Sequence, residues 1–144
     1  MKLEQILSMW KEDSQIDITE LGQEATKIPN LTQKYYEILV QERMLLRKQE
    51  YDLKKLKLEK YEFYTQGPNE ETEQKGWMLP PKGIIIKSEI PMYLDADKDI
   101  IELSLKIGVQ QEKVEALETI IKSLKDRGFN IRAAIDDLKM KLGV

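Results

Sequence analysis

Two residue types that perform much of enzyme chemistry are missing from this chain of 144 residues, which contains no histidine and no cysteine. Without an imidazole, no side chain has an ordinary pKa suited to a general base near neutral pH, and no serine–histidine pair can form. Without a thiol, the chain has no disulfide, no thiolate nucleophile and no zinc site of the cysteine–histidine kind. The sequence therefore predicts a protein that is not an enzyme and that carries no metal and no cofactor.

The residues best suited to chemistry are cations and aromatic rings in the middle of the chain. Residues 43–60 carry seven Lys or Arg against three Asp or Glu, a local charge of +4 in a chain whose net charge is −3. On a helical wheel of about 100° per residue, four of these cations lie within about 40° of one line along the helix. Tyr36 and Tyr61 lie on the same face, and Tyr51 lies at its border. Cations neutralise phosphates and exposed rings stack on unpaired bases, so this face predicts binding of single-stranded DNA. The predicted contacts are Arg43, Arg47, Lys54, Lys57 and Tyr61.

The same pattern permits other functions, because a charged face opposite an apolar stripe is typical of any surface helix. Lys60 falls inside the apolar stripe, where it could extend outward from an interface or form the edge of a groove. Two long helices joined by a short β element also describe prefoldin-like chaperones, whose apolar stripes would hold unfolded clients. A structural coiled-coil scaffold that binds neither DNA nor clients is a third alternative.

Long helices must position this basic face. No glycine or proline occurs from Asn30 to Tyr64, which predicts a helix of about 52 Å at 1.5 Å per residue. Pro29 is predicted to interrupt or start this helix, and Gly67 to end it. A short helix over residues 2–12 precedes these elements.

Residues 65–94 differ from the rest because they hold four of the five prolines. The β-branched run Gly83–Ile90 predicts a short strand or hairpin near residues 76–94. We expect one domain overall with three parts: N-terminal helices including the basic helix at 1–64, the Pro/Gly-rich loop with its β element, and C-terminal helices at 95–144.

The C-terminal part carries a heptad repeat. Aspartates between residues 95 and 99 suit a helix N-terminus, and β-branched residues at a with Leu at d favour coiled-coil pairing. Gln110 is the single polar residue of this seam, Gly128 is predicted to end the helix, and a final helix begins near Asn130. The fold class is therefore mainly α, a coiled-coil-like bundle that oligomerises through its C-terminal helices. The predicted oligomerisation residues are Ile100, Leu103, Ile107, Val114, Leu117, Ile121 and Leu124.

Several segments share their order and spacing with a known family. The main ones are Tyr93–Ile100, with the sequence YLDADKDI, and Lys122–Ile131, with the sequence KSLKDRGFNI. Shorter segments at 1–4, 16–21, 23–25, 61–64 and 87–89 fit the same pattern. Together they resemble the UvsY-like recombination mediators of T-even-type bacteriophages over nearly the whole chain, with the central loop as the exception.

This resemblance implies a small helical protein that binds single-stranded DNA and assembles as a ring of six or seven identical subunits. It implies two further partners, a RecA-like phage recombinase and the phage single-stranded-DNA-binding protein that the recombinase displaces, in recombination, repair and recombination-dependent replication. The implied location is the cytoplasm of the infected bacterial host, with no membrane contact. The family's Lys-x-Arg motif for DNA precedes a tyrosine-rich helix end. Lys60 matches the second basic residue and Leu58 replaces the first, so the resemblance adds Lys60 and Tyr64 to the predicted contacts.

Overall fold

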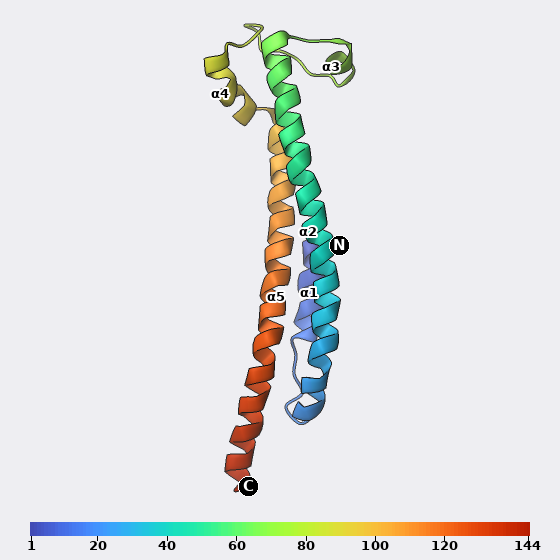
Figure 1. Ribbon diagram of the computed structural model, residues 1–144, viewed down its shortest axis with the longest axis vertical. Helices are drawn as coiled ribbons and strands as arrows, with labels where there is room; N and C mark the ends of the chain where they lie inside the picture. The colour runs from blue at the N-terminus through green and yellow to red at the C-terminus, as the bar shows by residue number, and fades with distance from the viewer. The chain divides into compact units, whose positions relative to one another are not determined.

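The structure is a computed structural model that describes all 144 residues, and it consists of helices and connecting segments without any strand (Figure 1). The helices are α1 (Leu3–Asp13), α2 (Leu21–Gln66), α3 (Glu70–Gln74), the short 3-10 helix η1 (Lys87–Glu89), α4 (Ile90–Asp95) and α5 (Lys98–Leu142). The mainly helical class is therefore confirmed. The chain divides into unit 1, residues 1–45 with 109–144, and unit 2, residues 46–108, so α2 and α5 contribute to both.

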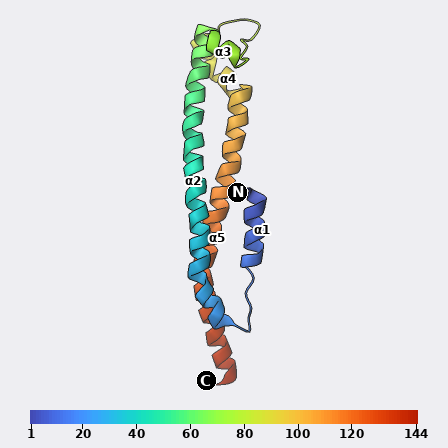
Figure 2. The same ribbon diagram turned by 90° about the vertical axis from the view of Figure 1, so that its right-hand side faces the viewer.

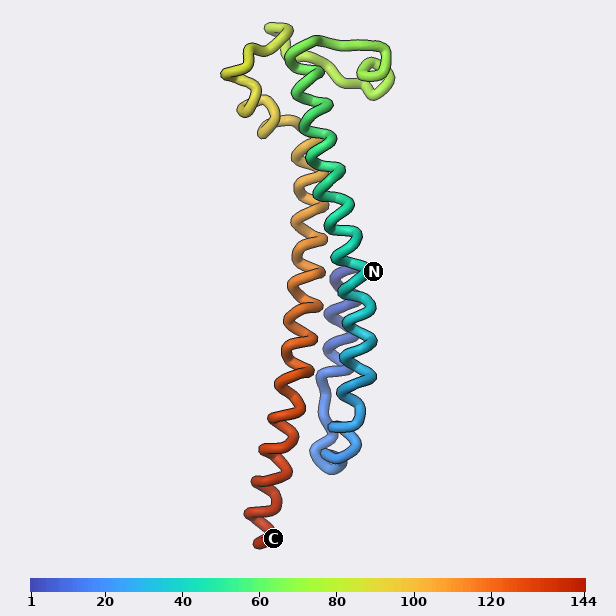
Figure 3. Tube along the Cα trace, in the orientation of Figure 1, coloured from blue at the N-terminus to red at the C-terminus, as the bar shows by residue number.

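In unit 1, α1 lies alongside the first part of α2 and the later part of α5 (Figures 1 and 2). The chain reverses direction in the linker between α1 and α2 (Figure 3). Ile6 of α1 is buried, and the ring of Trp10 packs edge-on against Tyr35 of α2 with 5.6 Å between centroids. The Tyr35 hydroxyl donates a hydrogen bond to Asp13 Oδ2 at 2.7 Å. These contacts hold the apolar face of α1 against α2.

Two buried polar side chains of α5 in unit 1, Gln110 and Arg127, donate hydrogen bonds to groups of α2 and α1. Gln110 of α5 donates to the backbone carbonyl oxygen of Glu42 at 2.9 Å and also to its carboxylate. Arg127 donates to the carbonyl oxygen of Asp13 at 3.1 Å and lies 5.4 Å from the centre of the Trp10 ring. Because an unpaired buried polar group costs about 1–3 kcal/mol, these bonds select one register of the helices. Gln110, the polar residue of the predicted seam, thus bonds within its own chain.

The predicted interruption at Pro29 is wrong, because α2 runs through this residue without a break. A proline inside a helix removes one backbone hydrogen bond and costs about 3 kcal/mol. Glu24 on one side of Pro29 and Tyr35 on the other are both buried in unit 1. Their packing offsets the missing hydrogen bond, so that the helix continues through Pro29.

The predicted helix end at Gly128 is also wrong, since α5 continues to Leu142. Arg127 and Ile131, which flank the glycine, are both buried, and this packing favours a continuous helix. The glycine with the left-handed conformation typical of a helix C-terminus is Gly143, with φ of 74°. Both glycines follow basic residues, so the capping pattern alone does not distinguish them.

Gly128→Ala is expected to stabilise the protein by about 0.5–1 kcal/mol, because alanine loses less backbone entropy than glycine in a helix interior. A Cβ at this position has room, with Ile28 Cδ1 as its nearest neighbour at 3.9 Å. Urea unfolding measures the difference. Gly67→Ala is the control: Gly67 ends α2 with φ of 90°, and a left-handed alanine costs about 1–2 kcal/mol. Destabilisation by Gly128→Ala would contradict a continuous α5.

In unit 2, the end of α2 forms a small core with the segment that leads to α5. Phe63 and Tyr64 of α2 pack with Ile85 and Ile90, and all four are buried. Partly buried side chains surround this core, namely Tyr61, Trp77, Leu79, Tyr93 and Leu94. As predicted, α2 ends before Gly67, whose N–H donates to the Phe63 carbonyl oxygen at 2.9 Å.

The predicted β element near residues 76–94 is wrong. The Ile85 N–H donates to the carbonyl oxygen of Tyr64 at 2.9 Å, and the chain then enters η1 and α4. A β-branched run forms a stable strand only where other strands pair with it, and unit 2 supplies helices instead. Burial of Ile85 and Ile90 against α2 therefore determines the conformation of this segment.

Candidate nucleic-acid interface

Three of the predicted DNA-binding cations, Arg47, Lys54 and Lys57, lie exposed on α2 within unit 2. Their spacing of seven and three residues places them on one side of the helix. The ion pairs of this unit are made by other cations, namely Lys60, Lys75 and Lys82. Within unit 2, therefore, the three exposed cations form no ion pair, and Glu50 is the one acid on their side of the helix. A line of exposed positive charge is what the phosphates of a single strand require.

Two further exposed cations of α2, Lys48 and Lys55, lie outside the predicted contact set. They are seven residues apart, so they share a side of the helix next to Arg47 and Lys54. The charge of +4 over residues 43–60 includes both. That local charge, rather than the narrow angular sector on the wheel, was the signal that could have identified them.

Arg43, the fourth predicted cation, belongs to unit 1 and has a partner there. Its Nη2 lies 3.1 Å from Glu118 Oε1, and both side chains are about half exposed. An ion pair of this kind contributes little to stability in water. Arg43 is therefore paired with a carboxylate, whereas Arg47 and Lys54 form no ion pair.

Lys60, a predicted DNA contact, is enclosed rather than exposed. The residue is 4% exposed. Its Nζ lies 2.7 Å from Asp99 Oδ2, 3.2 Å from Asp97 Oδ2 and 3.9 Å from the centre of the Trp77 ring. A phosphate could reach this ammonium only by displacing two carboxylates. The match of Lys60 to the family's DNA motif therefore does not place a cation at the surface of unit 2.

Tyr64 is buried as well, and its hydroxyl donates to Asp97 Oδ2 at 2.6 Å. Burial and the adjacent negative charge of Asp97 raise the pKa of Tyr64 well above its ordinary value. Tyr61 is partly buried against the core of unit 2. Tyr64 therefore offers no free ring for a base, and Tyr61 offers only part of one.

Asp97 joins the end of α2 to the start of α5. Its Oδ1 accepts hydrogen bonds from the N–H groups of Asp99 at 2.9 Å and Ile100 at 3.1 Å, so the predicted acidic helix start is confirmed. Burial alone would raise the pKa of Asp97, but hydrogen bonds from Tyr64 and Ile100 and the charge of Lys60 lower it below its ordinary value of 3.8. The stabilisation by this carboxylate is therefore present at neutral pH and is lost only as the pH falls below about 4.

The predicted oligomerisation residues of α5 lie mostly inside the chain itself. Leu103 and Ile121 are partly buried, and the others are buried: Ile100, Ile107, Val114, Leu117 and Leu124. A heptad seam needs an apolar partner surface, which a single chain can also provide. The exposed apolar residues of α5 lie outside this seam. They are Ile101, Leu105 and Val109 near its start and Phe129, Leu138, Met140 and Leu142 toward its C-terminal end, where Leu138 is 50% and Leu142 69% exposed.

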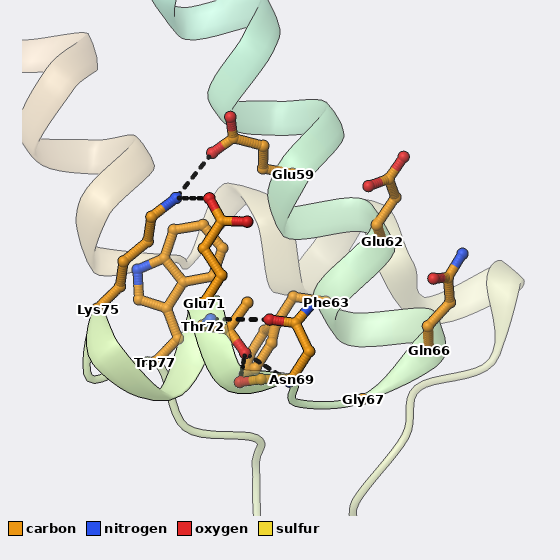
Figure 4. Close-up of a pocket in the computed structure, with 10 residues that line it drawn as sticks. All are labelled: Glu59, Glu62, Phe63, Gln66, Gly67, Asn69, Glu71, Thr72, Lys75 and Trp77. Atoms are coloured by element: carbon orange, nitrogen blue, oxygen red, sulfur yellow. Dashed lines mark hydrogen bonds and ion pairs between the residues drawn. The ribbon is translucent and has the colours of Figure 1, made fainter.

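A pocket of about 150 Å³ lies between the end of α2 and α3 (Figure 4). Its lining includes Glu59, Glu62, Phe63, Glu71, Lys75 and Trp77. Lys75 points toward Glu59 and Glu71, with Nζ to oxygen distances of 3.5 and 3.3 Å (Figure 4). Three carboxylates against one ammonium make this pocket negative, so it disfavours phosphate and lies outside the candidate interface.

The chain contains no group of three or more acidic side chains placed to hold a metal ion. None of its helices is both long enough and apolar enough to cross a membrane. Among the features described, the exposed cations of α2 are the ones whose chemistry suits a nucleic acid.

Known proteins resemble this chain at the level of the family and of the fold. The chain matches the family described as "Recombination, repair and ssDNA binding protein UvsY" over residues 9–144. No curated protein matches the chain.

The fold is similar to crystal structures of the bacteriophage T4 recombination mediator protein UvsY. For lattice type II the TM-score is 0.80 at 24% identity, covering 100% of this chain and 99% of that chain. For lattice type IV the TM-score is 0.79 at 20% identity, covering 98% of this chain and 99% of that chain. For lattice type I the TM-score is 0.79 at 21% identity, covering 95% of this chain and 98% of that chain. Because these sequence identities are below 25%, the similarity to these structures shows the fold alone.

Proposed function

The chain belongs to the UvsY family of recombination, repair and single-stranded-DNA-binding proteins, and from this membership we propose that it is a recombination mediator that holds single-stranded DNA on α2. The observation that carries the proposal is the exposure of Arg47, Lys54 and Lys57 with no carboxylate partner in unit 2. The role is one of binding and not of catalysis.

As a mediator, the protein presents the bound strand to a RecA-like recombinase while the phage single-stranded-DNA-binding protein is displaced. Three to five cations per subunit hold phosphates by salt-sensitive attraction, which is weak enough to release the strand to the recombinase. This activity serves recombination, repair and recombination-dependent replication in the cytoplasm of the infected bacterial host.

A titration of the purified protein with a labelled oligothymidylate at increasing salt tests this function. We expect the logarithm of the binding constant to fall linearly with the logarithm of the salt concentration, by about 0.7 for each phosphate contacted on a single strand. Binding that is absent or insensitive to salt would contradict the proposal. A prefoldin-like chaperone would instead suppress aggregation of an unfolded client without binding DNA, and a structural scaffold would do neither.

We also propose that the subunits form a homo-oligomeric ring, with the exposed end of α5 as the contact between copies. Leu138 and Leu142 lie four residues apart, so they share a side of the helix, and both are at least half exposed. The buried seam residues of α5 are unavailable for this contact. A ring multiplies the few cations of one subunit along one strand and raises the effective affinity.

Replacing Leu138 and Leu142 together with glutamate is expected to dissociate the oligomer, because like charges then meet at an apolar contact. Affinity for a long single strand should fall by about 100-fold as avidity is lost. Light scattering measures the mass and anisotropy measures the binding. Met140→Glu is the matched control, since Met140 is exposed on the other side of α5. An intact oligomer in the double variant would exclude this contact.

A further inference from the structure

One aromatic side chain of unit 2, Tyr51, is surrounded by cations and exposed to solvent. On a helix surface, the neighbours of a residue are those three and four positions before and after it. For Tyr51 all four of these positions carry cations: Arg47, Lys48, Lys54 and Lys55. The aromatic ring of Tyr51 therefore has positively charged side chains both before and after it along the helix.

The ring itself is accessible. Tyr51 is 63% exposed, and the Nζ of Lys54 lies 5.2 Å from the ring centre. Tyr35 and Tyr64 differ from Tyr51 in accessibility, because both are buried and their hydroxyls donate hydrogen bonds to aspartates. Tyr51 instead leaves apolar ring surface in water, which costs free energy in the unbound protein. A flat partner would cover this surface.

We propose that Tyr51 is the base-stacking residue of the interface and gives it a preference for single-stranded over double-stranded DNA; this inference rests on the proposed function of α2. A base of the strand stacks on the ring of Tyr51, while Arg47, Lys48, Lys54 and Lys55 neutralise the phosphates on both sides of it. Aromatic rings stack on bases of any sequence because every base has a π face.

The preference for single strands follows from the accessibility of the bases. Duplex DNA has about one charge per 1.7 Å of its axis against about one per 3.4 Å along one strand. Cations alone therefore favour the duplex. In a duplex the base faces are covered by neighbouring bases, whereas an unpaired base can leave its stack and lie on Tyr51. The ring thus supplies the discrimination that the charges cannot.

The test compares three probes of equal length: an oligothymidylate, an abasic deoxyribose-phosphate strand and a duplex. Tyr51→Leu is expected to lower affinity for the oligothymidylate by about 5- to 100-fold, the effect of losing one stacked base. Affinity for the abasic strand and for the duplex should change by less than about 2-fold, because their phosphate contacts remain. Tyr51→Phe keeps the ring and should bind like the original protein.

Tyr36→Leu is the matched control. Tyr36 shares the line of cations on the helical wheel and is exposed on α2, but it lies in unit 1 and no cation occupies its four neighbouring positions on the helix. We expect it to bind all three probes normally. Equal losses of Tyr51→Leu on the oligothymidylate and the abasic strand would overturn the inference, as would no loss on either. In both cases salt-dependent binding by the original protein would leave the proposed function standing. If the original protein binds no strand at all, the proposed function itself fails.

Discussion

Replacing Arg47, Lys54 and Lys57 together with alanine is expected to weaken binding of single-stranded DNA by on the order of 100-fold at low salt, because three phosphate contacts per subunit are lost. The salt dependence should also become shallower, by about 2 in logarithmic slope per subunit at roughly 0.7 per contact. All three side chains are exposed, and alanine is a good helix former, so α2 should keep its structure. Fluorescence anisotropy with a labelled oligothymidylate over a range of salt concentrations measures both quantities.

A charge-matched variant separates a specific face from general electrostatics. Lys122, Lys125 and Arg132 are exposed on α5, and replacing them with alanine lowers the net charge by the same amount. We expect this control to bind with nearly the original affinity and slope. If the two triple variants lose affinity equally, the protein attracts DNA through its overall field and α2 is not the interface. An unchanged affinity in the α2 variant alone would place the DNA-binding face elsewhere.

Lys60→Ala is expected to destabilise the protein by about 3–5 kcal/mol, because it leaves Asp97 buried without its cation. Lys60 and Asp97 are both almost fully enclosed, with side chains 5% and 4% exposed, and their charged atoms lie 3.2 Å apart. Urea unfolding followed by Trp77 fluorescence in a Trp10→Phe background reports on unit 2, since the Trp77 ring lies 3.9 Å from the Lys60 ammonium. Lys57→Ala, three residues earlier and exposed, should change stability by less than about 0.5 kcal/mol.

A second variant keeps this prediction testable if Lys60→Ala fails to fold. Lys60→Met with Asp97→Asn removes both charges, so its loss of stability should be smaller than the sum of the two single changes. The folded double variant should bind single-stranded DNA with nearly the original affinity. If Lys60→Ala is instead as stable as Lys57→Ala and loses DNA binding, Lys60 contacts DNA directly, as the resemblance to the family motif implies.

The two lysines illustrate why a motif match and a structural role can differ. Lys57 and Lys60 have the same chemistry and lie within one helical turn of each other. Their environments differ because Trp77, Asp97 and Asp99, all distant in sequence, cover only Lys60. A sequence pattern records which side chains share a helix face, but it does not record which part of that face another segment covers.

The features that the sequence determined by itself are local ones. The absence of glycine and proline from Asn30 to Tyr64 was sufficient to predict the long helix, and Gly67 to predict its end, because these depend on backbone preferences of nearby residues. The cluster of positive charge on α2 likewise followed from composition and helical spacing. The mainly helical fold could therefore be inferred from the sequence, and the family from the resemblance of segments such as Tyr93–Ile100 and Lys122–Ile131.

The tertiary structure decided the features that depend on packing between distant segments. Burial on both sides of Pro29 and of Gly128 keeps α2 and α5 continuous, although each residue is a local signal for a break. Burial of Ile85 in a helical core removes the predicted strand. Packing also determines that Lys60 is enclosed while Tyr51 is exposed. The physical reason is the same in each case: local preferences amount to a few kcal/mol at most, and the burial of side chains by segments far along the chain contributes as much or more.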